Sequence, residues 1–106
     1  MKPAILVTFT VKTKKFSSRY EITKFFRTLY GWNQTVCHGE KRYKYKRDGL
    51  LDKIPHIRID QSSFLIPERF FEEVEDFFSH WDDKVIFKTF KVLVEEEFKW
   101  LKRKRK

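Results

Sequence analysis

The stretch FLIPERFFEEVEDFFSHW, residues 64–81, decides the fold of this chain. Six large apolar residues in it repeat at i, i+1, i+4, i+7, i+8 and i+11, so they share one face of a helix. These residues are Phe70, Phe71, Val74, Phe77, Phe78 and Trp81. Because Pro67 suits the first position of a helix, the pattern predicts an amphipathic helix over residues 68–81.

A second amphipathic helix is predicted over residues 18–30. Ser18 and Glu21 lie three residues apart, as in a capping box at a helix start. Gly31 stands where a left-handed residue commonly ends a helix. The apolar residues between these signals fall at one-face helical spacing. They are Ile22, Phe25, Phe26, Leu29 and Tyr30.

The remaining segments contain the predicted strands. Residues 4–11 and 85–94 are rich in apolar and β-branched side chains, which is typical of strands. The Lys-Tyr alternation in residues 35–47 has a period of two and predicts one strand there. Shorter strands are expected in residues 56–60 and 64–66.

The order strand–helix–strand–strand–helix–strand predicts an α+β fold. Two helices with one apolar stripe each need one sheet face to cover, so we expect a small antiparallel or mixed sheet with both helices on one face. The nearest named topology is the ferredoxin-like one. The second sheet face would then lack a helical cover, unless a C-terminal helix or another subunit lies on it.

The C-terminal residues 95–106 read EEEFKWLKRKRK. Acids followed by bases complement the dipole of a helix, which favours a final helix. We assign residues 1–98 to a single domain and residues 99–106 to a basic C-terminal tail.

The composition limits the class of protein. A chain of 106 residues builds one domain with one core. No apolar run reaches the roughly 18 residues of a spanning helix, so we expect no membrane partner. The single cysteine, Cys37, excludes a disulfide within the chain and favours the cytoplasm. Many Lys and Glu, with few Asn, Gln, Met and Cys, match the trend of hyperthermophile proteins.

The charges are distributed unevenly along the chain. The formal net charge is +9, yet residues 68–83 carry seven acids and one base. A polyanion would be attracted by the rest of the chain and repelled by this acidic segment. We therefore expect a protein with two electrostatic faces.

The strongest functional signal is EKRYKYKRDG, residues 40–49. Five of the seven residues from 41 to 47 are basic, and the other two are Tyr43 and Tyr45. Cations bind phosphates, and flat aromatic rings stack on unpaired bases. In a regular strand the two tyrosines share one face. We expect them to point into the core with their hydroxyls near its rim; the alternative is that they stack on bases. The lysines alone would also protect an edge strand from pairing.

Two further basic or aromatic elements extend the hypothesis. The C-terminal run KWLKRKRK suits a clamp on phosphates, and its alternative is a solvated tail. Two tryptophans lie beside basic or turn residues, where they either stack on bases or pack against the body. The predicted nucleic-acid contacts are Trp32, Lys41, Arg42, Tyr43, Lys44, Tyr45, Lys46, Arg47, Arg58, Trp100, Lys102 and Arg103.

Signals for metal or catalytic chemistry are weak. The soft ligands lack the paired spacing of zinc sites. They are Cys37, His38, His56 and His80. Asp48, Asp52 and Asp60 lie near His56 in sequence, which leaves a small metal-dependent nuclease as an alternative. No phosphate-binding glycine motif is present. We predict no enzyme, no cofactor and no metal.

The segments YKRDGLLDKIPHIRI and FLIPERFFEEVEDFFSHW resemble the ThermoDBP-related group of small archaeal single-stranded nucleic-acid-binding proteins. The resemblance covers roughly residues 30–95. It implies a sheet-plus-helices domain that holds single strands with aromatic and basic groups, often as an oligomer. The sequence thus predicts a non-catalytic protein for single-stranded DNA or RNA with low sequence specificity. The alternative is a protein-interaction or assembly module that docks on an acidic partner or self-associates.

Overall fold

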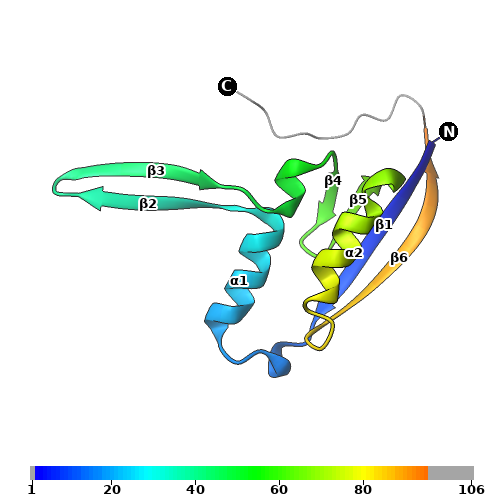
Figure 1. Cartoon of the computed structure of the whole chain (residues 1–106), viewed down its shortest axis with the longest axis horizontal. Helices are drawn as coiled ribbons and strands as arrows, with labels where there is room; N and C mark the ends of the chain where they lie inside the picture. The colour runs from blue at the N-terminus through cyan, green and yellow to red at the C-terminus, as the bar shows by residue number, and fades with distance from the viewer. Residues whose placement is uncertain (1, 96–106) are drawn as a thin grey trace.

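The fold combines a four-stranded sheet with two helices and a separate two-stranded hairpin (Figure 1). It is taken from a computed structural model, which describes residues 2–95. The sheet contains β1 (Lys2–Val11), β4 (Ile57–Asp60), β5 (Ser63–Pro67) and β6 (Val85–Val94). The two helices are α1 (Arg19–Tyr30) and α2 (Phe71–Ser79). The fold is the predicted α+β class.

The strand order in the sheet is β4-β5-β1-β6. β1 runs antiparallel to both β5 and β6, and β4 runs antiparallel to β5. With one helix after β1 and one after β5, this is the predicted ferredoxin-like topology. The strands predicted over residues 4–11 and 85–94 are confirmed.

Helix α1 begins and ends where the sequence predicts. The Ser18 side chain accepts a hydrogen bond from the Glu21 amide at 3.3 Å. At the other end, Gly31 has a positive φ of 84°, and its amide donates to the Arg27 carbonyl at 2.8 Å. The Glu21 carboxylate accepts from the amide and hydroxyl of Ser17 rather than from the Ser18 amide, a variation on the expected capping box.

Helix α2 is shorter than the predicted helix 68–81. Pro67 does not start it, because Pro67 has extended backbone angles and pairs with Ala4 of β1 at the end of β5. A 3-10 turn, η3 (Glu68–Phe70), separates it from α2. At the other end, Trp81 lies in a turn beyond Ser79 and still stacks on Phe16, with ring centroids 5.9 Å apart. The apolar stripe from which this helix was predicted therefore extends to Trp81, beyond the end of α2 at Ser79.

Both helices pack on the same face of the sheet, as predicted. The ring of Phe9 in β1 lies 5.6 Å from the ring of Phe25 in α1 and 5.4 Å from the ring of Phe78 in α2. All three are buried in one aromatic-rich core. One strand residue thus contacts both helices, which places them side by side.

The opposite face of the sheet carries apolar side chains next to the polar pair Thr8 and Lys88, and none of the helices in residues 2–95 covers it. Leu6 of β1 is flanked there by Leu65 of β5 and by Phe90 of β6. The side chains of Phe90 and Ile86 are 52% and 49% exposed. This agrees with the expectation of a second face without a helical cover. No helix in the described range is long and apolar enough to cross a membrane.

An ion pair joins the start of α1 to the residue before β6. The Lys84 ammonium donates to the Glu21 carboxylate, and this contact, with further hydrogen bonds from Ser17, lowers the pKa of Glu21 from 4.5 to about 2. A carboxyl whose pKa is lower in the folded state stabilises the fold above its unfolded pKa. That stability is lost as the pH falls through the interval from 4.5 towards 2.

We expect Glu21→Gln to flatten this acid limb of the stability profile. The measurement is urea unfolding of both proteins at a series of pH values between neutrality and about pH 3. Glu75→Gln, on the exposed side of α2, is the matched control and should keep the limb of the parent protein. An unchanged limb in Glu21→Gln would show that the ion pair does not link α1 to β6 in solution.

Candidate nucleic-acid interface

The basic stretch of the sequence forms a hairpin, not the single strand predicted over residues 35–47. β2 (Trp32–His38) and β3 (Lys41–Arg47) pair antiparallel, and a two-residue loop joins His38 to Lys41. Gly39, the first loop residue, has a positive φ of 63°. A two-residue loop with glycine at this position is a favoured hairpin connection. The signal was therefore present, although the Lys-Tyr alternation obscured it.

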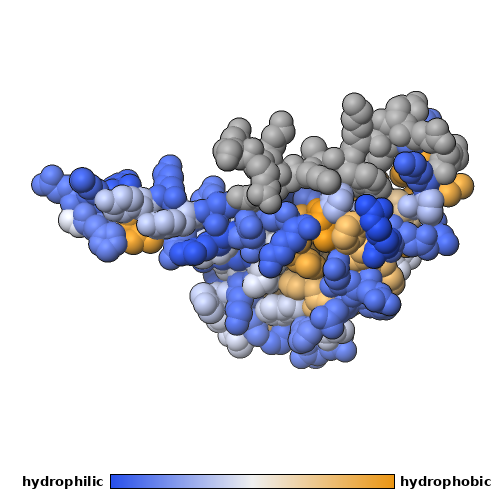
Figure 2. Space-filling model, turned by 45° about the horizontal axis from the view of Figure 1, so that its top comes forward, coloured by the Kyte–Doolittle hydropathy of each residue, from blue (hydrophilic) through white to orange (hydrophobic). Residues whose placement is uncertain are grey.

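The hairpin projects from the body of the protein, and we call residues 32–47 the arm (Figure 1). Its two strands pair only with each other. All seven residues of β3 are exposed, with Tyr43 at 41% and Tyr45 at 45%. The expectation that both tyrosines point into the core is wrong, because no core lies beneath the arm. Hydrophilic side chains cover most of the arm, whereas hydrophobic surface gathers on the body (Figure 2).

The pairing register sorts the arm into two faces. Residues directly opposite each other share a face, and side chains alternate along each strand. The aromatic face contains Trp32, Gln34, Val36, His38, Lys41, Tyr43, Tyr45 and Arg47. The basic face contains Asn33, Thr35, Cys37, Arg42, Lys44 and Lys46. The aromatic rings of the arm and three of its five cations thus occupy opposite sides.

Contacts within the aromatic face orient its side chains. The His38 and Tyr43 rings meet edge to face, with centroids 5.8 Å apart. The Arg47 guanidinium lies 5.5 Å from the Tyr45 ring centroid, and its Nε donates to Gln34 Oε1 at 2.6 Å. The two exposed tyrosines therefore each have a neighbour that limits their rotation.

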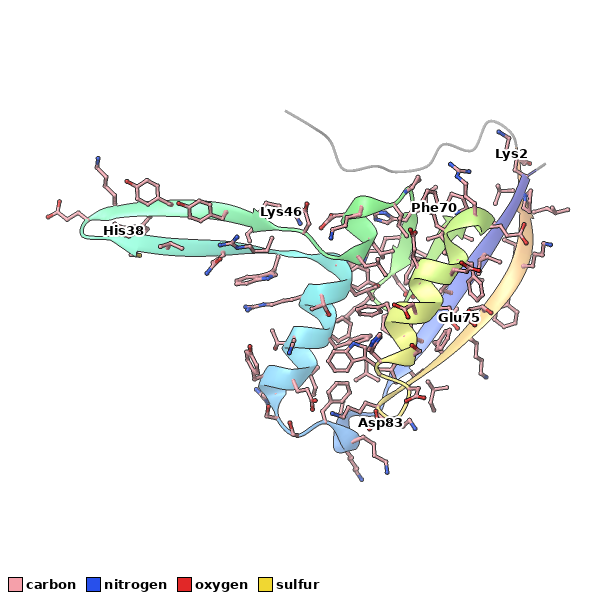
Figure 3. The ribbon with its side chains drawn as sticks, in the orientation of Figure 1. Lys2, His38, Lys46, Phe70, Glu75 and Asp83 are labelled. Carbon is pink, nitrogen blue, oxygen red and sulfur yellow. The ribbon has the colours of Figure 1, made fainter. Side chains whose placement is uncertain are left out.

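Few carboxylates oppose the positive charge of the arm. Glu40 is its only acid, against five bases. Within residues 2–95, Lys46 is paired with Asp52 at 3.3 Å, and no ion pair involves Lys41, Arg42 or Lys44. The acidic residues of α2, such as Glu75, lie on the body while the arm extends away from it (Figure 3). The cations of the arm therefore lie apart from this acidic helix.

The root of the arm is a close crossing of two chain segments. A Cβ built on Gly49 would lie 2.3 Å from the Gly31 amide nitrogen and 2.7 Å from the Leu29 carbonyl oxygen. The Gly49 amide donates to the Asp52 carboxylate at 2.9 Å, at the start of the 3-10 turn η2 (Leu50–Lys53). The segments that enter and leave the arm therefore meet without a side chain between them.

Arg58 lies on the body in β4, not on the arm. Its guanidinium carbon is 3.7 Å from the Tyr30 ring centroid. The Tyr30 hydroxyl donates to the Gln61 carbonyl at 2.6 Å, and burial raises the pKa of Tyr30 to about 12. Hydrogen bonds from the Ser63 hydroxyl and the Ser62 amide lower the pKa of the neighbouring Asp60.

Sequence reasoning missed Arg27. Its guanidinium carbon is 3.7 Å from the ring centroid of Trp32, the first residue of the arm. The five-residue spacing between them gives no helical or strand signal, because Gly31 separates a helix from a strand. Three other predicted contacts, Trp100, Lys102 and Arg103, lie outside the described residues, as does the predicted final helix.

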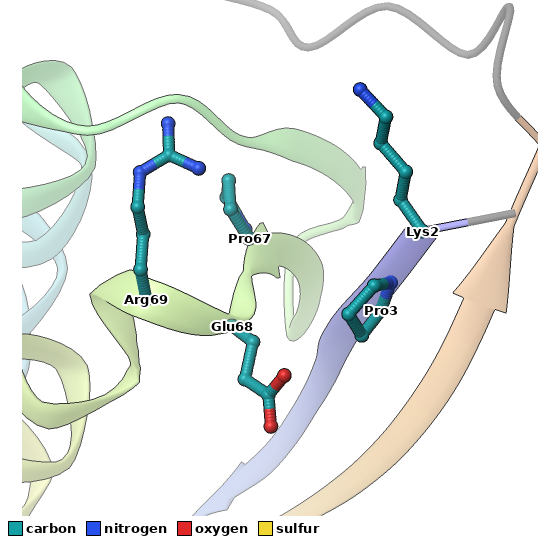
Figure 4. Close-up of a pocket in the computed structure, with 5 residues that line it drawn as sticks. All are labelled: Lys2, Pro3, Pro67, Glu68 and Arg69. Carbon is teal, nitrogen blue, oxygen red and sulfur yellow. The ribbon is translucent and has the colours of Figure 1, made fainter.

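Neither a metal site nor the hollow at the start of β1 is a stronger candidate than the arm. Among residues 2–95, no group of three or more His, Cys, Asp or Glu side chains lies close enough to hold a metal ion. A hollow of about 410 Å³ lies between the start of β1 and η3 (Figure 4). It is lined by Lys2, Pro3, Pro67, Glu68 and Arg69. The Glu68 carboxylate there is paired with Lys91 at 3.0 Å, so the hollow mixes both charges.

Comparison of the chain with protein-family models, curated proteins and solved structures finds no match.

Proposed function

We propose that this protein is a non-catalytic binder of single-stranded DNA or RNA with low sequence specificity, and that the arm is its main contact. The observation that carries the proposal is the exposure of all of β3, in which five cations alternate with two tyrosines away from the core. Because the side chains of β3 do not pack in a core, they are available to bind a ligand.

The chemistry of the arm favours unpaired strands over duplexes. Exposed aromatic rings contribute about 1–3 kcal/mol per stacked base, and a base must leave its duplex to stack on them. Every base has a flat face, and every nucleotide has a phosphate, so rings and cations accept most sequences. A strand that wraps the arm would present bases to Tyr43 and Tyr45 and phosphates to the basic face.

Composition and resemblance support the same proposal. The Lys- and Glu-rich chain with one cysteine favours a thermophilic source and the cytoplasm. The resemblance to the archaeal ThermoDBP-related group favours single strands as the ligand.

The test is fluorescence anisotropy with matched single-stranded and duplex oligonucleotides over a range of salt concentrations. If about five phosphates are neutralised on a single strand, log K should fall with log salt at a slope near −3.5. We expect tighter binding of the single strand at each salt concentration. A slope near zero, or no binding at low salt, would contradict the proposal.

A second candidate function is self-association through the uncovered sheet face. The exposed apolar side chains there, including Phe90 and Ile86, favour contact with another apolar surface. Lys88, which lies between them on β6, would have to stay at the rim of that contact or meet a carboxylate. Light scattering of the same samples, with and without oligonucleotide, separates the two functions. An oligomer that retains no nucleic acid would favour this second candidate.

A further inference from the structure

A groove of about 480 Å³ lies on the body beside the root of the arm. Its lining comes from one side of α1, from Gly31, from Arg58 of β4 and from Gln61 of the β4–β5 turn. The lining includes the side chains of Ile22, Phe26, Arg27, Tyr30 and Arg58. Ile22 and Phe26 are half-buried and form an apolar part of this lining, whereas both arginines are exposed.

Each arginine of the groove lies against an aromatic ring. Arg58 lies 3.7 Å from the Tyr30 ring centroid, and Arg27 lies 3.7 Å from that of Trp32. A guanidinium in such a position is held by electrostatic attraction to the ring face. Tyr30 is fixed in turn by its hydrogen bond to Gln61 and by parallel stacking on Phe26, with centroids 6.3 Å apart. The groove therefore presents two oriented planar cations.

The charge of the lining selects an anion. The lining contains two arginines and no acid. The carboxylates next to the lining in sequence are Glu21 and Asp60, and Glu21 is paired with Lys84. Asp60 accepts hydrogen bonds from the Ser62 amide and the Ser63 hydroxyl at 2.8 Å each, and its charge also attracts Arg58, whose Nε donates to the Asp60 carbonyl at 3.3 Å. A ligand with a negative group and a flat apolar part would satisfy both the cations and the apolar lining.

We propose that this groove is a subsite for one unstacked nucleotide of the same strand that the arm holds. The inference rests on the proposed function and deepens it by naming a second contact. Its volume lies within the range of about 300–1,000 Å³ typical of small-ligand sites. The base would lie against the Arg58 guanidinium and the apolar lining, since guanidinium planes and aromatic rings both stack on bases. The phosphate would lie between Arg27 and Arg58.

The position of the groove makes one continuous path with the arm. Gly31 lines the groove, and the next residue, Trp32, begins β2. Trp32 belongs to the aromatic face, together with Tyr43 and Tyr45. A strand that stacks along this face therefore reaches the groove at the arm's root.

The test compares Arg58→Met with a matched control, Arg69→Met. Both arginines are exposed and lie over an aromatic ring, Arg69 at 4.9 Å from the Phe70 centroid, but Arg69 does not line the groove. We expect Arg58→Met to weaken single-strand binding about tenfold, as for the loss of one stacked base. Duplex binding should change no more than in Arg69→Met. Thermal melting checks that both variants remain folded.

The outcomes separate this inference from the proposed function. Equal loss of single-strand affinity in Arg58→Met and Arg69→Met would overturn the subsite and leave the arm as the contact. Arg58→Lys should bind the single strand less tightly than the parent protein, because the ammonium keeps the charge for the phosphate and loses the plane that stacks on the base. Affinity like that of the parent protein would overturn the subsite. If the parent protein binds neither single strand nor duplex, both proposals fail.

Discussion

Excision of the arm is expected to abolish most nucleic-acid binding and to leave the body folded. Asn33 and Lys46 face each other in the hairpin, so residues 34–45 can be replaced by Asn-Gly, which closes a two-residue turn. The buried core cluster has no member between Leu29 and Leu51, so excision removes no core contact. Loss of two stacked bases alone should weaken binding by at least about 30-fold.

Electrostatics alone must be excluded as the cause of this loss. The excised segment contains three bases and one acid, so its removal lowers the net charge by two. Lys14→Gln with Lys15→Gln lowers the net charge by the same amount on exposed residues before α1, at the opposite end of that helix from the arm. Anisotropy with one labelled single strand compares the two. Equal affinities would show that the arm contributes only charge.

Substitution Phe25→Ala is expected to destabilise the fold by about 3–5 kcal/mol. Phe25 is fully buried, and its ring lies 5.1–5.7 Å from those of Phe9, Phe26, Phe77 and Trp81. Removing the ring loses its burial and leaves a cavity lined by rigid aromatic groups, which cannot collapse easily. Since domains of this kind are stable by about 5–15 kcal/mol, a large share of the free energy of unfolding would be lost.

Chemical denaturation followed by circular dichroism measures this loss. Tyr20→Ala is the control on the same helix, because Tyr20 is 71% exposed and should change stability by no more than about 0.5 kcal/mol. A loss below about 1 kcal/mol in Phe25→Ala would mean that α1 does not pack on the sheet through this residue.

The sequence predicts the body of this fold well because the buried residues of its helices recur with the period of a helix. The stripes of Phe25 and Leu29 in α1 and of Val74 and Phe78 in α2 can be satisfied only against a sheet face. The boundaries of α2 were wrong because periodicity reports which residues are buried, and not whether the backbone between them is helical. Trp81 packs against the core from a turn, outside the helix.

The candidate site was predicted in composition and not in shape. The basic and aromatic residues from 41 to 47 were identified, and their alternation was correct. Alternation gives the two faces of a strand, yet it does not reveal whether either face meets a core. The tyrosines were therefore assigned to the wrong environment. The groove beside Arg27 and Arg58 depends on residues about 30 positions apart, and no local pattern connects them.

The two glycines at the root bear on the entropy of association. At the root of the arm the backbones of Gly31 and Gly49 are in contact, so the arm has little room to rotate relative to the body. A receptor that already holds its recognition element in one direction loses little conformational freedom on binding. The ordering cost would then fall mainly on the flexible polynucleotide. A side chain introduced at position 49 would push the two backbones apart and change the direction of the arm. The affinity for a polynucleotide would then change although residue 49 itself does not contact the ligand.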